Sequence, residues 1–176
     1  MEIINLGESD GLPPVDWAAV VEQLAAGSAP APDAVNSRTT WLSTVNEDGS
    51  PHVTAVGAMW LDGTFWFQTG TGTGTRKWRN EARDPRCSIA VSIRNADVVI
   101  EGDAARLPNR ARWRVLRRRG LTTAGRSNPT AVGRALLPRS THRRKDHPPW
   151  HMYRIEPRSA IVTLAAEPGS LTRFRF

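Results

Sequence analysis

Apolar and polar positions divide the chain into a short helix followed by a series of strands. In LPPVDWAAVVEQLAAG the apolar residues recur at helical spacing, at Trp17, Val20, Val21 and Leu24. Asp16 is a suitable N-cap for this helix and Gly27 a suitable stop. The next stretch, SAPAPDAVNS, is rich in Pro, Ala and Ser and predicts a loop.

Strand-forming residues dominate most of the remaining chain, with turn residues between them. Predicted strands cover residues 38–45, 51–60, 64–69, 86–93, 97–106, 150–157 and 159–167. Asp48-Gly49 and Asp62-Gly63 supply tight turns between the first three strands. RKWRNEARD (76–84) predicts a short helix that Pro85 ends. About seven short strands with few helices predict a mainly β fold, in which antiparallel hairpins close into a small barrel.

The composition indicates a single domain over residues 1–176, with its helix and loop in residues 1–37. The single cysteine, Cys87, excludes an internal disulfide and a cysteine-rich metal site, and we expect it to be buried and inert. The four histidines lack zinc-binding spacing, so no metal site is predicted. No apolar run approaches the ~20 residues of a membrane span. MEIINLGESD lacks the basic-then-apolar order of a secretion signal, so we expect a cytoplasmic protein without membrane contact.

Positive charge is concentrated in one segment. Residues 104–145 hold twelve arginines and one lysine without any Asp or Glu, which exceeds the net charge of +7 for the whole chain. The rest of the chain is therefore acidic, unlike a protein that binds nucleic acid over its whole surface. Three interpretations of the basic excursion over 109–147 stay open: a mobile insertion, a contact with nucleic acid or another polyanion, and a compensated frame shift in a GC-rich gene.

The stretch TGTGTGTRKWRN (69–80) carries the clearest chemical signal. Thr75 stands where an N-cap belongs, and Arg76 and Lys77 form the first turn of the predicted helix. Cations normally avoid this positive end of the helix dipole, so two of them there favour a bound anion. The glycines let the backbone approach the anion, and Thr69 and Thr75 offer hydroxyl donors. The alternative is a solvated surface turn; a P-loop is excluded because its GxxxxGK[ST] pattern is absent.

Several motifs in chain order resemble the split-barrel family of pyridoxamine-phosphate-oxidase-like proteins, which bind flavins or deazaflavins. The family pattern D-G-x-P-H-x-x-x-V appears over residues 48–56, S/T-R-K-x-x-N over 75–80 and D-P-R over 84–86. Glu81 stands where the family usually has Leu. The ending TRFRF resembles the tail of the deazaflavin branch. Residues 13–108 and 148–176 take part in the resemblance.

The resemblance implies a homodimer of six-stranded antiparallel split β-barrels with a flavin-type cofactor in each cleft between the subunits. The cofactor would be FMN or the deazaflavin coenzyme F-420, whose phosphate residues 75–77 would hold. The residues expected to bind it are Thr69, Thr75, Arg76, Lys77 and Asn80, with His52, Trp60, Arg173 and Phe174. The alternative for His52 is a locally paired strand histidine, and that for Trp60 is a core tryptophan. The alternative for Arg173 and Phe174 is a frayed C-terminus.

The expected activity is hydride transfer between the cofactor and a small organic substrate. No nucleophile–base pair is visible, which suits an enzyme whose cofactor performs the chemistry. The vitamin B6 oxidase itself is disfavoured because its C-terminal substrate-binding arginine and histidine pattern has no counterpart here. Two other functions stay open: a split barrel that binds flavin or haem without turnover, and nucleic-acid binding through residues 109–147.

Overall fold

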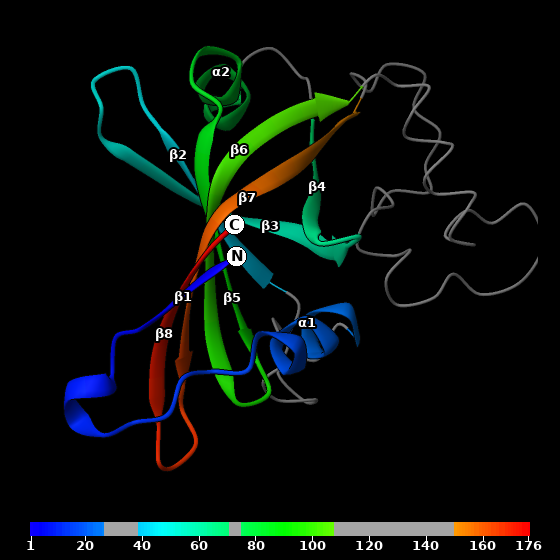
Figure 1. The fold of residues 1–176 in the computed structure, drawn as a ribbon. Helices are drawn as coiled ribbons and strands as arrows, with labels where there is room; N and C mark the ends of the chain where they lie inside the picture. Colours follow the sequence, from blue (N-terminus) through cyan, green and yellow to red (C-terminus); the bar gives the residue numbers. More distant parts are fainter. Residues whose placement is uncertain (27–38, 71–74, 108–149) are drawn as a thin grey trace, which may run out of the picture.

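The computed structural model describes residues 1–26, 39–70, 75–107 and 150–176 (Figure 1). The predicted loop over 28–37 and the basic excursion over 109–147 lie outside these residues. No helix in the described part is long and apolar enough to cross a membrane. The elements, in chain order, are β1 (Glu2–Asn5), η1 (Glu8–Asp10), α1 (Trp17–Ala26), β2 (Thr39–Val45), β3 (Pro51–Leu61), β4 (Thr64–Gly70), α2 (Arg76–Arg83), β5 (Arg86–Ile93), β6 (Ala96–Leu107), β7 (Trp150–Leu164) and β8 (Ser170–Arg175).

Six strands form a closed antiparallel barrel. The order β7-β4-β3-β2-β5-β6 runs around it, and the pairing of β6 with β7 closes the ring. The predicted six-stranded split barrel is therefore confirmed. The turns form as the sequence predicts: Gly49 has a positive φ of 84°, and Asp62 and Gly63 have φ of 52° and 76°, which is typical of a two-residue hairpin turn.

β7 is one long strand, so the prediction of separate strands over 150–157 and 159–167 was wrong. One edge of β7 pairs with β6, while the other pairs first with β4 and then with β8. The ladder with β6 shifts register between Glu101 and Gly102. The two backbones approach so closely there that a Cβ on Gly102 would lie 2.1 Å from the carbonyl oxygen of Glu156. Pro157 lies at this bulge, where a strand tolerates a missing N–H.

The C-terminal tail is a strand rather than a frayed end. β8 lies between β7 and β1, and β1 was not predicted. Phe174 is fully buried, and its ring centroid lies 4.9 Å from that of Trp17 in α1. The side chain of Phe174 therefore belongs to the core of this chain, and its contact with the cofactor stays an untested prediction.

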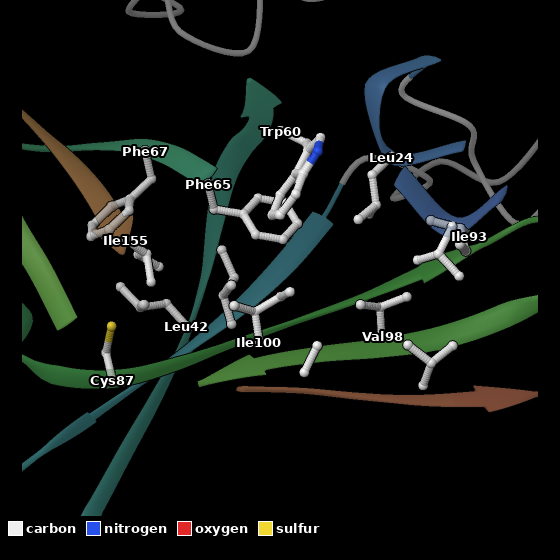
Figure 2. Packing of buried hydrophobic residues seen from close by; sticks show 14 of the residues in the cluster. Leu24, Leu42, Trp60, Phe65, Phe67, Cys87, Ile93, Val98, Ile100 and Ile155 are labelled. Carbon is white, nitrogen blue, oxygen red and sulfur yellow. The ribbon is translucent and has the colours of Figure 1, made fainter. Parts of the chain in front are cut away.

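The two helices lie at opposite ends of the barrel (Figure 1). α1 begins as predicted, because the Asp16 carboxylate accepts a hydrogen bond of 2.9 Å from the Ala18 N–H. Its residues Val20 and Leu24 enter the core. Figure 2 shows Leu24 beside Trp60 in this cluster, with Cys87 at the opposite side of the view. The core thus reaches from α1 to the region under α2.

Candidate functional site

Helix α2 is pinned to the end of β2. The Asn80 side-chain N–H groups donate 3.1 Å hydrogen bonds to the Thr44 hydroxyl and the Asn46 side-chain oxygen. Arg83 donates to the backbone carbonyl of Val45. Both N–H groups of Asn80 are therefore used inside the chain, so Asn80 fixes the orientation of α2.

The Asp84-Pro85-Arg86 motif forms the exit from α2. The Asp84 carboxylate accepts hydrogen bonds of 2.9 and 2.6 Å from the Arg86 guanidinium and one of 3.1 Å from the Arg86 backbone N–H. These bonds lower the pKa of Asp84 to about 2. The Pro85 carbonyl accepts a 2.7 Å bond from the Ala104 N–H of β6. The motif therefore fixes the backbone between α2 and β5.

The start of α2 carries unpaired donors and positive charge. Thr75 precedes the helix with extended backbone, φ −58° and ψ 135°, and does not cap it with its side chain. The Thr75 Oγ1 atom is buried and has no hydrogen-bond partner among the residues that the structure describes. Arg76 is exposed and Lys77 half-buried, and no described carboxylate forms an ion pair with either. Residues 75–77, hereafter the basic turn, thus offer an anion a hydroxyl, free helix N–H groups and two cations.

Two other predicted residues lie on neighbouring strands. His52 in β3 pairs in register with Thr44, the acceptor for Asn80, so its side chain lies on the sheet face that α2 contacts. Thr69 lies near the end of β4, where its backbone pairs with His151 of β7. The Thr69 side chain is outside the described part. The register therefore places His52 beside the residues that hold α2.

Within one chain, the structure does not bring Trp60 or Arg173 to the basic turn. Trp60 is 7% exposed, with ring centroids 5.0 Å from Phe65 and 6.3 Å from Trp17. This core position agrees with the alternative of a core tryptophan, and the contact of Trp60 with the cofactor stays an untested prediction. Arg173 lies in β8, between Ile4 of β1 and Ile161 of β7, with its Nε atom buried and unpartnered among the described residues.

Sequence reasoning missed a buried acid beneath the basic turn. Glu81 is 6% exposed, and neither carboxylate oxygen accepts a hydrogen bond of normal geometry from the described residues. Burial raises its pKa to about 8, although the nearby Lys77 ammonium and Tyr153 hydroxyl oppose the rise. The available signal was the replacement of the usual Leu by Glu, four residues after Lys77.

Burial also shifts the pKa of two neighbours of Glu81. Burial, followed by the charge of Glu81, raises the pKa of the Tyr153 hydroxyl to about 12. The Tyr153 ring stacks on Phe67 at 5.2 Å. The same two causes, in the same order, raise the pKa of the Cys87 thiol to about 12. Cys87 is therefore buried, as predicted, and its thiol stays protonated at neutral pH.

The described chain is therefore a small split barrel with two cations at a helix start that the Thr75 side chain does not cap. The chain belongs to the pyridoxamine 5'-phosphate oxidase family, whose profile matches residues 33–160. This confirms the resemblance on which the sequence interpretation depends. No curated protein matches the chain in sequence.

Solved structures share the fold at low sequence identity. A pyridoxamine 5'-phosphate oxidase-related, FMN-binding protein from Nostoc punctiforme is 13% identical, with a TM-score of 0.59 over 91% of each chain. A haem-binding protein from Mycobacterium smegmatis is 16% identical, with a TM-score of 0.60 over 93% of this chain and 60% of the other. PhzG from Burkholderia lata, solved with tetrahydrophenazine-1-carboxylic acid, is 17% identical, with a TM-score of 0.56 over 98% and 92%.

Proposed function

We propose that this protein is an oxidoreductase that binds FMN through the phosphate of the cofactor. The observation that carries the proposal is the basic turn. Its Thr75 hydroxyl is buried without a hydrogen-bond partner among the described residues, and neither Arg76 nor Lys77 forms an ion pair with a described carboxylate. A phosphate monoester is a dianion at neutral pH with three acceptor oxygens. It would satisfy the Thr75 hydroxyl and the helix N–H groups while balancing Arg76 and Lys77.

The residues of the basic turn suit a phosphate, and neighbouring contacts hold them in place. Arg76 would donate a forked pair of hydrogen bonds, and Lys77 would add a compact charge. Asn80 and Arg83 hold α2 against β2, so the donors are fixed before the ligand arrives. FMN, when bound, supplies the hydride acceptor and donor for a small organic substrate. The chain supplies the contacts that hold the phosphate and orient the cofactor. His52 lies on the sheet face that α2 contacts.

The direct test compares FMN with riboflavin, which lacks the phosphate. We expect FMN to bind at least tenfold more tightly, because a single charge-assisted hydrogen bond contributes roughly 1.5–3 kcal/mol. Fluorescence titration of the cofactor-free protein measures both affinities. Equal affinity for the two flavins would refute the proposal. Binding of the deazaflavin F-420 in place of FMN would move the assignment to that cofactor, and a Soret band in the purified protein would favour haem.

We also propose that two chains pair through the outer face of β2, β3 and β5. Trp41 in β2 is 51% exposed and Val53 in β3 is 57% exposed. Ala55 and Ala90 pair with Trp41 from either side, so small residues flank the ring. An exposed tryptophan flanked by small residues is typical of the apolar centre of an interface.

Trp41→Glu is expected to convert a dimer into a monomer, because the interface would have to bury a charge without a partner. Light scattering at micromolar concentration measures the mass. Leu6→Glu is the matched control, since Leu6 is an exposed apolar residue outside this face, and it should remain dimeric. A monomeric wild type, or a Trp41→Glu variant that stays dimeric, would contradict this surface. If the site is shared between subunits, the monomer should also lose FMN affinity.

A further inference from the structure

Lys77 and Glu81 are four residues apart in α2, and therefore lie on one side of the helix, one turn apart. Lys77 belongs to the basic turn and is half-buried. Glu81 is buried, and neither of its oxygens accepts a hydrogen bond of normal geometry from the described residues, although the Tyr153 hydroxyl lies near. The same helix thus carries an anion-binding cation at its start and a buried acid one turn later.

The groups around Glu81 come from several elements. Lys77 of α2 is the cation that acts on it, the Tyr153 hydroxyl faces it from β7, and the Cys87 thiol lies near it in β5. Arg106 of β6 acts on Tyr153, and Asp103 of β6 acts on Cys87. Tyr153 and Cys87 keep their protons at neutral pH, so Glu81 is the group in this cluster that changes charge near physiological pH.

We propose that Glu81 is a positioning residue that makes phosphate binding at the basic turn depend on uptake of a proton. The inference rests on the proposed function, because it concerns how the protein binds the phosphate of FMN. The observations that carry it are the burial of Glu81, the absence of a well-formed hydrogen bond to its oxygens from the described residues, and its place one helical turn from Lys77.

The coupling acts through Lys77. When Glu81 is neutral, the Lys77 ammonium has no competing carboxylate among the described residues and is available to the phosphate. When Glu81 loses its proton, the new carboxylate attracts Lys77 and repels the phosphate dianion at the same end of the helix. By linkage, a bound phosphate must hold the proton on Glu81 more tightly. Binding at a pH near the pKa of Glu81 therefore takes up a proton.

FMN titrations of the whole protein between pH 7 and pH 9 test the proposal. The phosphate is a dianion throughout this range. With the pKa of free Glu81 at about 8, one linked proton weakens FMN binding by about threefold to tenfold from pH 7 to pH 9. Calorimetry at pH 8, in two buffers that differ in ionisation enthalpy, should show uptake of up to about half a proton. Riboflavin, without a phosphate, should show neither effect.

Glu81→Gln removes the titrating group, and its FMN affinity should be independent of pH with no proton uptake. Glu81→Leu serves the same purpose if the amide variant does not fold. Glu22→Gln, an exposed carboxylate on α1 at the other end of the barrel, should keep the wild-type profile. If FMN binds more tightly than riboflavin but its affinity is flat in the wild type, or falls equally in Glu81→Gln, the coupling is refuted and the phosphate site stands. If the two flavins bind equally, the phosphate site itself fails.

Discussion

Glu81→Leu is expected to stabilise the cofactor-free protein at pH 8.5 by about 3–5 kcal/mol, which raises the melting temperature by roughly 10 °C. In the wild type, Glu81 is buried near Tyr153 and Cys87, and neither of its oxygens accepts a hydrogen bond of normal geometry from the described residues. An acid in such a place either ionises in dry surroundings or holds a proton that water would remove. Leucine avoids both costs and adds apolar burial.

The pH dependence has a definite sign. The pKa of Glu81 is about 8 in the folded chain and 4.5 when unperturbed, so the folded state binds the extra proton between these values. Wild-type stability from this group is therefore fully present below about pH 4.5 and is lost as the pH rises to about 8. Urea unfolding of wild type and Glu81→Leu at pH 5.5 and 8.5 measures the difference, which should be larger at pH 8.5.

Glu22→Leu is the matched control, because Glu22 is an exposed helical carboxylate and its replacement should change stability by less than about 0.5 kcal/mol. Other groups titrate in the same range, so the quantity to compare is the gap between the two proteins at each pH. A gap that is absent, or equal at both pH values, would show that Glu81 is ionised and solvated in the folded chain.

Arg76→Ala and Lys77→Ala are each expected to weaken FMN binding by about 10- to 150-fold, because each removes a charge-assisted contact of roughly 1.5–3 kcal/mol. The fold should persist, since the contacts that pin α2 come from Asn80 and Arg83. Arg79→Ala is the matched control: Arg79 is an exposed arginine one turn further along the same helix, and its loss should cost less than about threefold.

Riboflavin separates a direct contact from a general loss of structure. In the wild type, removal of the phosphate should lower the affinity greatly, whereas in the Arg76→Ala, Lys77→Ala double variant it should matter much less. Circular dichroism and melting temperature confirm that the variants are folded. If riboflavin loses as much affinity as FMN in the double variant, the two cations act through the fold rather than on the phosphate.

The barrel could be predicted from the sequence because local signals mark most of its strands. Asp48-Gly49 and Asp62-Gly63 separate strands that pair with their neighbours in sequence, and such pairs need no long-range information. β7 was divided in two because Pro157 is a strand breaker in most contexts, and only the bulge opposite Gly102 makes it acceptable. β1 was missed because its partner, β8, lies at the far end of the chain.

Only the part of the candidate site that depends on a local sequence pattern could be predicted. The basic turn is a local pattern, so Thr75, Arg76 and Lys77 could be read from the chain as the start of a helix. The packing of Trp60 and Phe174 against Trp17 depends on how α1 closes one end of the barrel. The burial of Glu81 depends on the strands that surround α2. Long-range packing decides these roles, and no short motif encodes it.

The pairing of β1 with β8 has a mechanical consequence. Glu2 pairs with Arg175 in register, and their side chains form an ion pair of 3.3 Å. The two chain ends therefore leave the sheet at the same point (Figure 1). A force that pulls the ends apart would load the hydrogen bonds of this pair one after another, as in a zipper, starting at Glu2. The barrel would stay closed while β1 peels away, since the ring of six strands does not include β1 or β8.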